Sequence, residues 1–181
     1  MPQITITEAL AMLKVKHAKI EKKWAFIETH LMRQEKLKDP LANDGGSVVL
    51  IQRELQAIGD LETDIVSTQR AIREANLNTP ITTTSVTRSL SDWLTWRKEV
   101  AEIRKQHLDA LSTLITRTRQ QAQNRGLQVI AANVNAESPD NFVVNINEKD
   151  LAKWREDLEA MLGTLDGLFS LKNATVLIDV P

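Results

Sequence analysis

The stretch TITEALAMLKVKHAKIEKKWAFIETHL, residues 5–31, decides the fold. It opens with Thr5 and, three residues later, Glu8, a capping-box pattern that satisfies the free N–H groups at a helix start. Apolar residues with one histidine among them then follow at alternating steps of three and four: Leu10, Leu13, His17, Ile20, Trp24, Ile27 and Leu31. This period is typical of a coiled-coil seam, so we predict a helix over about residues 7–37 that packs against a partner along its length.

Three later segments show similar spacing. Residues 47–76 carry isoleucines seven apart; Glu62 and Gln69 weaken this seam, and Leu61 is the alternative packing residue. Residues 90–124 carry two apolar rows: Trp93, Trp96, Val100, Ile103, His107, Ala110 and Leu114 in one, and Leu90, Leu94, Ala101, Leu108, Leu111 and Ile115 in the other. A helix with two rows can contact more than one neighbour, so we place this helix centrally. A last helix, preceded by Asn147 and running to about residue 171, carries the stripe Leu151, Trp154, Leu158, Met161, Leu165 and Leu168.

Strand-like patterns occupy the rest of the C-terminal part. LQVIAANV (127–134) and NFVVNIN (141–147), separated by turn residues at 138–141, predict a β-hairpin. ATVLIDV (174–180) predicts a strand that could join this hairpin, pair with QITIT (3–7), or add to a neighbouring subunit.

The predicted fold class is therefore mainly α. We expect a long antiparallel helical hairpin or coiled-coil bundle of four helices, with a small β-hairpin and a C-terminal strand. The expected domains are 1–125, with three helices, and 126–181, packed on the same core.

Composition excludes several classes of protein. The 181 residues contain no cysteine, which rules out a disulfide framework, a thiolate zinc site and a cysteine nucleophile. The 23 Lys and Arg nearly balance the 24 Asp and Glu, which argues against a general nucleic-acid binder. No apolar run reaches the roughly 20 residues of a membrane span, and the start MPQITITEAL lacks the pattern of a secretory signal. We expect a cytoplasmic or virion-associated protein.

Charge alternates along the chain. Residues 14–39 and 88–125 each hold eight Lys or Arg against four Asp or Glu, whereas 44–74 and 137–179 are acidic. Neighbouring helices could therefore meet with opposite charges, which we favour. Alternatively, the basic helices bind an anionic partner through Lys16, Lys19, Lys22, Lys23 and Arg104.

Candidate catalytic chemistry is sparse. His17 and His107 could form a metal pair or a pH-sensitive contact, but no second ligand pair lies beside either, so core histidines are the favoured interpretation. The Gly45–Gly46 pair lacks the Lys-Ser/Thr that follows in a phosphate-binding loop and indicates a hinge. We therefore predict no enzyme, no cofactor, no metal and no small-molecule substrate.

IREANLNT (72–79), RSLSDWLTWR (88–97) and Glu8-Ala9-Leu10 are similar to a family of small uncharacterised helical proteins of bacteria and their phages, some named septicolysin. The resemblance implies the order of helices, with a short β-containing section before the last one. It implies no mechanism for particular residues. The chain departs from the family in its Thr-rich turn and in the strand after the last helix.

These observations together predict a non-enzymatic structural or assembly protein that acts through helical packing and self-association, and the resemblance implies a phage origin. Its partners are copies of itself or other protein subunits. The predicted interaction residues are Trp24, Ile27 and Leu31 on the first helix, and Val176 and Ile178 in the tail. The alternative is an adaptor for nucleic acid or a membrane surface that uses the basic helices. Nucleic acid or a membrane is an expected partner only under this alternative.

Overall fold

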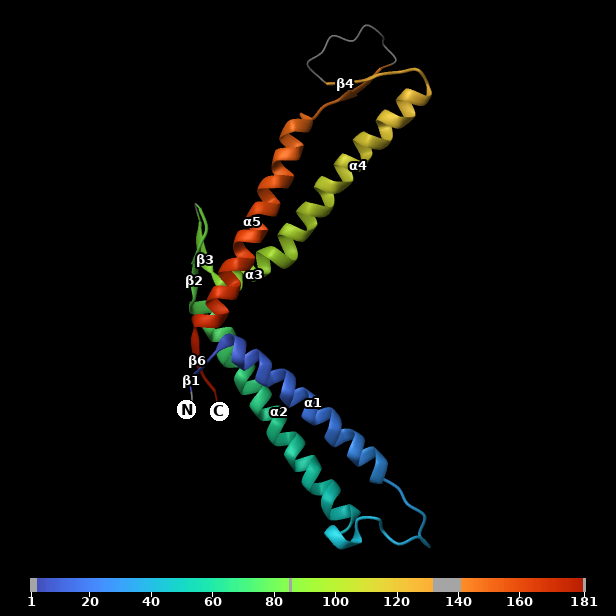
Figure 1. The fold of residues 1–181 in the computed structure, drawn as a ribbon, viewed down its shortest axis with the longest axis vertical. Coiled ribbons are helices and arrows are strands. Elements are labelled where there is room, and N and C mark those ends of the chain that lie inside the picture. The colour runs from blue at the N-terminus through green and yellow to red at the C-terminus, as the bar shows by residue number, and fades with distance from the viewer. Residues whose placement is uncertain (1–2, 85, 132–140, 181) are drawn as a thin grey trace. The chain divides into compact units, whose positions relative to one another are not determined.

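The structure, a computed structural model, describes residues 3–84, 86–131 and 141–180. As predicted, long helices dominate and short strands are minor elements (Figure 1). The helical elements are α1 (Ile6–His30), α2 (Ser47–Asn78), α3 (Leu90–Thr95), a π-helical turn (Trp96–Ala101), α4 (Glu102–Asn124) and α5 (Glu148–Thr175). The strands are β1 (Gln3–Thr5), β2 (Pro80–Thr82), β3 (Thr87–Ser89), β4 (Val129–Ala131), β5 (Phe142–Val144) and β6 (Leu177–Asp179).

The chain forms two compact units. The first contains residues 1–79 and 170–181, and the second contains residues 80–169. This division differs from the expected 1–125 and 126–181, because α5 contributes to both units: its last residues and β6 belong to the first.

In the first unit, α1 and α2 form the predicted helical hairpin (Figure 1). The capping box is present: the Glu8 backbone N–H donates to the Thr5 hydroxyl at 3.2 Å, and the Thr5 backbone N–H donates to the Glu8 carboxylate at 2.7 Å. The hydrogen bond from the Thr5 backbone lowers the pKa of Glu8. At its other end α1 stops at His30, well before the expected residue 37.

The start of α2 is fixed by Asp39, eight residues upstream of Ser47. Gly45 and Gly46 have φ of 101° and 89°, and Gly46 offers no side-chain cap. Asp39 takes the capping role: its carboxylate accepts from the Ser47 backbone N–H at 2.8 Å, from the Ser47 hydroxyl and from the Leu41 N–H at 2.9 Å. The Ser47 hydrogen bonds lower the pKa of Asp39 to about 2. The glycine pair is therefore part of a capped turn.

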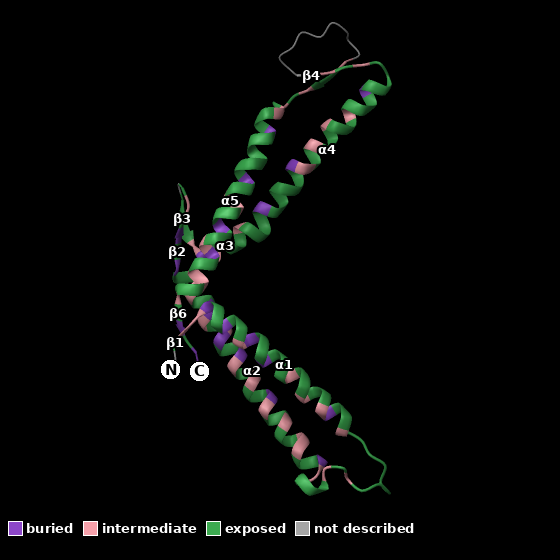
Figure 2. Ribbon diagram, in the orientation of Figure 1, coloured by how far each residue is buried: buried purple, intermediate pink, exposed green. Residues whose placement is uncertain are grey.

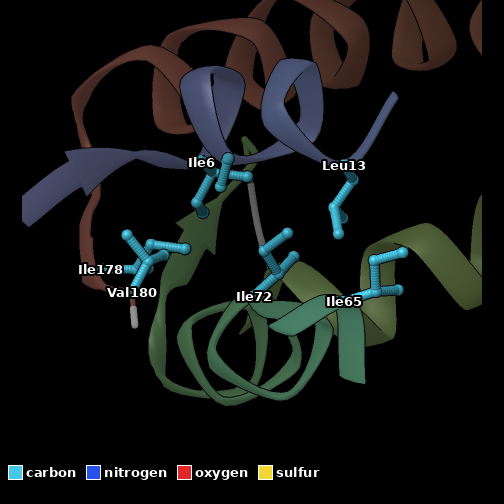
Figure 3. Close-up of a cluster of buried hydrophobic side chains, with 7 residues drawn as sticks. Ile6, Leu13, Ile65, Ile72, Ile178 and Val180 are labelled. Atoms are coloured by element: carbon cyan, nitrogen blue, oxygen red, sulfur yellow. The ribbon is translucent and has the colours of Figure 1, made fainter. Parts of the chain in front are cut away.

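The terminal strands close the first unit. β6 pairs antiparallel with β1, with Ile4 opposite Ile178. This settles the three arrangements left open for the tail in favour of the QITIT strand. Figure 3 shows the resulting core, in which the tail side chains pack with α1 and α2. The labelled members are Ile6, Leu13, Ile65, Ile72, Ile178 and Val180.

In the second unit, the helical run from α3 to α4 packs against α5 (Figure 1). Ser89 caps α3: its hydroxyl accepts from the Asp92 N–H at 3.0 Å. The fully buried Trp93 donates its indole N–H to the Ile81 carbonyl at 3.1 Å and meets Trp96 edge-on. Two clusters form the core of this unit: Ile81, Leu90, Trp93, Leu165 and Phe169 in one, and Ala101, Leu108, Leu151 and Leu158 in the other.

The predicted β-hairpin over 127–147 is wrong, because β4 and β5 are parallel. The Phe142 N–H donates to the Gln128 carbonyl at 3.0 Å, and the Gln128 N–H donates to the Asn141 side chain at 3.1 Å, so both strands start at the same end. A parallel pair needs a connection that returns along the full strand, which a tight turn cannot provide. Of the turn placed at 138–141, residues 138–140 lie outside the described residues.

A hairpin that the sequence analysis missed follows α2. β2 and β3 pair antiparallel, with Ile81 opposite Arg88, and the hydroxyls of Thr82 and Thr87 lie 2.8 Å apart. The Thr-rich stretch after α2 is thus a sheet element, in which β-branched residues are favoured.

Candidate interaction site

The sequence pattern located only one of the two rows that form the α1–α2 seam. Leu13, Ile20 and Ile27 face α2, as predicted, but the other buried or half-buried row consists of Ala9, Lys16, Lys23 and His30. The row predicted in its place lies one residue further along the helix and is exposed: Leu10, His17, Trp24 and Leu31. Figure 2 shows the buried and half-buried residues on the facing sides of the two helices.

The α2 half of the seam shows the same one-residue offset. Ile51, Ile58, Ile65 and Ile72 are buried or half-buried, as expected. Between them Glu54, Leu61 and Thr68 face α1, whereas Leu55 and Glu62 are exposed. Leu61, predicted as the alternative packing residue, packs in the seam in place of Glu62.

The three residues of the first helix that were predicted to mediate interaction therefore differ in their exposure to solvent. Ile27 is only 5% exposed and packs inside the hairpin, so its prediction as a surface contact is wrong. Trp24 and Leu31 are 42% and 61% exposed and are available to a partner.

Ion pairs set the register of the hairpin and place exposed apolar residues of α2 near these two. Lys16 Nζ lies 3.0 Å from Asp64, and Lys23 Nζ lies 2.5 Å from Glu54. In an antiparallel pair, the residues that follow the seam positions of both helices lie along one edge. This geometry places Trp24 and Leu55, which follow Lys23 and Glu54, on the same edge, and about two helical turns further on, Leu31 and Val48 continue it. We call these four exposed residues the hairpin edge: Trp24, Leu31, Val48 and Leu55.

The tail residues do not form a surface for strand donation. Ile178 is buried in the core of the first unit, Val176 is half-buried against that core, and β6 already pairs with β1. A strand that is paired within its own chain has no free edge toward β1 to offer a neighbour. The prediction that Val176 and Ile178 mediate contacts between subunits is thus contradicted.

The basic residues are only partly available. Lys16 and Lys23 face α2 and make the two ion pairs described above; the side chain of Lys16 is 11% exposed. Lys19 and Lys22 are exposed on α1, and Arg104 is exposed on α4 in the second unit.

Ion pairs between the helices of the second unit extend the same pattern. Arg97 lies 3.0 Å from Asp166, Arg155 lies 2.9 Å from Asp109, and Arg119 pairs with Glu148. In four of these five pairs the base lies on a basic segment and the acid on an acidic one, as favoured from the sequence; in Arg155–Asp109 the charges are reversed.

The π-helical turn changes which side of α4 is buried. In a regular helix the position after Trp93 on the same face would be seven residues on, at Val100. The π-helical turn adds one residue, so the buried row continues instead at Ala101, Leu108, Ile115 and Ala122, all buried or half-buried. The prediction of a central helix that packs through two apolar rows is therefore wrong, because only one row is buried.

The row displaced by this turn is exposed along α4. Val100, Ile103 and Leu114 are 49%, 54% and 59% exposed, and His107 and Ala110 between them are exposed too. We call this set the α4 outer row: Val100, Ile103, His107, Ala110 and Leu114.

Neither His17 nor His107 is a core residue. His17 lies on the exposed row of α1 and His107 on the α4 outer row. Within residues 3–84, 86–131 and 141–180, no group of three His, Asp or Glu is placed to hold a metal ion.

Two surface grooves of the second unit are lined in part by α4. The larger, of ≈ 610 Å³, is lined by Leu94, Arg97, Lys98, Glu102, Lys105, Leu162 and Asp166. It is open, and its Arg97 is already neutralised by Asp166. The second, of ≈ 330 Å³, is apolar and lies between α4 and β5, with Leu111, Leu114, Phe142 and Val143 in its wall. Neither brings together an acid and a base in the manner of a catalytic site.

The two carboxylates with lowered pKa, Glu8 and Asp39, both lie at helix starts where they accept backbone hydrogen bonds. A perturbed pKa often marks a functional site, but structural hydrogen bonding produces the same effect. Their position assigns them to helix capping.

Comparison with protein-family models gives no match, and comparison with curated proteins gives none. Among solved structures, a functionally unknown conserved protein from Corynebacterium diphtheriae is similar, with a TM-score of 0.59 and 15% sequence identity. The similarity covers 98% of this chain and 100% of that one, and at this identity it shows the fold alone. In the described part of the chain, no helix has the length and apolar character needed to cross a bilayer.

Proposed function

We propose that this protein is a non-enzymatic structural or assembly protein that binds copies of itself or other protein subunits through exposed rows on its helices. Phage origin and a cytoplasmic or virion-associated location, expected from the sequence, belong to the same proposal.

The observation that carries the proposal is a second apolar row beside a complete seam. α1 already packs on α2 through one set of residues, yet Leu10, Trp24 and Leu31 continue the same period in solvent. α4 likewise packs on α5 and leaves its outer row exposed. Exposed apolar residues in a helical row are typical of a surface that binds another helix.

The adaptor alternative receives less support. Lys16 and Lys23, two of its five basic residues, make ion pairs with α2. A lysine neutralised by a carboxylate contributes little to binding of phosphate groups. Lys19 and Lys22 are left on α1 as exposed bases.

Sedimentation velocity over a range of concentrations tests the proposal. Trp24→Lys introduces a charge at the hairpin edge, and Val15→Lys is the matched control, because Val15 is exposed on α1 but lies off that row. Burial of a tryptophan contributes roughly 2–3 kcal/mol, so Trp24→Lys should weaken association through the hairpin edge by about thirtyfold or more. Val15→Lys should leave association unchanged.

Two results would count against the proposal. One is equal weakening by both variants, which would show that the hairpin edge is not the contact. The other is a chain that stays monomeric at high concentration and binds salt-sensitively to nucleic acid or anionic vesicles, which would favour the adaptor.

A further inference from the structure

The large apolar residues on the exposed side of the π-helical turn and α4 are placed symmetrically about His107. Val100 and Leu114 lie seven residues before and after it, and Ile103 and the 40% exposed Leu111 lie four before and after it. The row from Val100 to Leu114 spans roughly 21 Å of helix at 1.5 Å per residue. Two antiparallel copies therefore place each of these apolar residues opposite an apolar residue. An in-register parallel pair would do the same, so the flanking charges decide the orientation.

We infer that a second copy of this chain covers the α4 outer row, with the two α4 helices antiparallel and a two-fold axis beside His107. This inference rests on the proposed function and gives the partner and the orientation for one of its surfaces. Val100 of each copy meets Leu114 of the other, Ile103 meets Leu111, and the two His107 side chains face each other at the centre.

The charges at the ends of the row favour the antiparallel arrangement. Glu99 precedes the row and Arg117 follows it; both are exposed, and helical spacing places them toward the same flank. Within the described residues neither makes an ion pair. An antiparallel pair brings each Glu99 close to the partner copy's Arg117, whereas a parallel pair would oppose like charges. Exposed ion pairs add little affinity but set orientation.

The apolar groove beside the row adds contact area. Leu114 and Leu111 belong both to the outer face of α4 and to the wall of the ≈ 330 Å³ groove that β5 closes with Phe142 and Val143. In the antiparallel pair, Val100 of the second copy lies at the mouth of this groove. A contact along one helix still buries less than the roughly 800 Å² per partner of a standard interface, so we expect a dissociation constant in the micromolar range.

Disulfide trapping tests the arrangement in the full chain, and the absence of natural cysteine makes the result unambiguous. His107→Cys should form a covalent dimer on mild oxidation, because the two-fold axis brings its Cβ atoms within the roughly 4.5 Å that a disulfide requires. A mixture of Val100→Cys and Leu114→Cys should cross-link more than either variant alone. The matched control is Thr116→Cys, which is exposed on α4 but lies off the row, and it should stay monomeric.

A charge swap tests the orientation by sedimentation. Glu99→Arg and Arg117→Glu should each weaken the dimer about three- to tenfold, since two symmetric ion pairs are lost, and the double variant should restore it. His107→Leu should tighten the dimer by about tenfold, because it replaces a polar residue at the centre of the seam. Circular dichroism of each variant checks that the helices are intact.

The outcomes separate this inference from the proposed function. If the chain self-associates but His107→Cys cross-links no better than Thr116→Cys, the assignment to α4 is overturned while the proposed function stands. If the double charge variant is weaker than both single variants, the antiparallel orientation is overturned. If the chain does not self-associate at high concentration, the second copy is excluded as the occupant, and the proposed function then depends on other subunits. Salt-sensitive binding of the monomer to anionic vesicles would also overturn the assignment of a second copy to the α4 outer row.

Discussion

Deleting Lys98 should leave the second unit nearly as stable as before, although the deletion falls inside a helix. Trp93 and Ala101 are both buried and lie eight residues apart, one more than the seven that a regular helix allows on one face. The π-helical turn accommodates the additional residue. Removing the exposed Lys98 restores a seven-residue interval, so α3 and α4 become one regular helix and every buried residue keeps its place.

Deleting Thr113 is the matched control, because it is also exposed on the same helical run but lies where the row is already regular. After this deletion Ile115 and Ala122 rotate off the seam, and Thr116 and Gln123 take their positions. Losing the half-buried isoleucine and the buried alanine costs about 1.5–2 kcal/mol, and burying an unpaired glutamine amide adds about 1–2 kcal/mol. We expect the Lys98 deletion to change the free energy of unfolding by less than about 1 kcal/mol, and the Thr113 deletion to lower it by about 2–4 kcal/mol.

Urea unfolding followed by circular dichroism at 222 nm measures both values, and near-ultraviolet signal from the tryptophans reports whether the core is intact. If the two deletions cost the same, or if the Lys98 deletion costs more, the π-helical turn is not a register correction. The explanation for the exposed α4 outer row would then be lost as well.

Three further outcomes follow from particular contacts. Asp64→Ala should destabilise the first unit by about 1–2 kcal/mol in urea unfolding because it leaves the Lys16 ammonium unpaired in the seam, whereas Lys16→Met should cost less than about 1 kcal/mol or stabilise. Trp93→Phe should cost about 2–3 kcal/mol in the same assay, because a buried carbonyl of β2 loses its donor and the core loses volume. The pKa of Asp39 is lowered from 3.8 to about 2, so its stabilising contribution is present above pH 4 and is lost as the pH falls toward 2. The unfolding temperature of Asp39→Asn should fall less steeply with decreasing pH than that of the unmodified chain. An equal dependence on pH would refute the capping role.

The helices and their starts could be predicted from the sequence because their signals are local. Thr5 with Glu8, and Ser89 with Asp92, lie within one helical turn, and capping depends only on that turn. The seven-residue spacing of isoleucines on α2 likewise predicts a helix whatever it packs against. The end of α1 was less predictable, because the helix stops at His30 although the predicted helix ran to residue 37. The start of α2 at Ser47 was predicted correctly, although its cap comes from Asp39, across a loop.

The choice of buried row could not be made from the pattern alone. On α1, Trp24 is more apolar than Lys23, yet Lys23 faces the seam because Glu54 on α2 is there to neutralise it. Hydrophobicity ranks each residue separately, whereas burial depends on what the partner helix presents at the same level. The π-helical turn poses the same difficulty: only the eight-residue interval between Trp93 and Ala101 indicates it, and that interval is visible only once both are known to be buried.

Not every exposed apolar residue calls for a partner, and position distinguishes those that do. Val66 and Leu171 are as exposed as Leu31 but belong to no row, and single apolar residues are common on protein surfaces. By contrast, two rows keep a strict seven-residue interval. One follows α1 and its C-cap: Leu10, His17, Trp24 and Leu31. The other follows the π-helical turn and α4: Val100, His107 and Leu114. Each row also contains one histidine. A single polar residue within an apolar seam disfavours shifted pairings, since any shift opposes it to a hydrophobic side chain. If these rows are seams, their histidines should therefore determine register, and replacing either with leucine should strengthen association while making its geometry less specific.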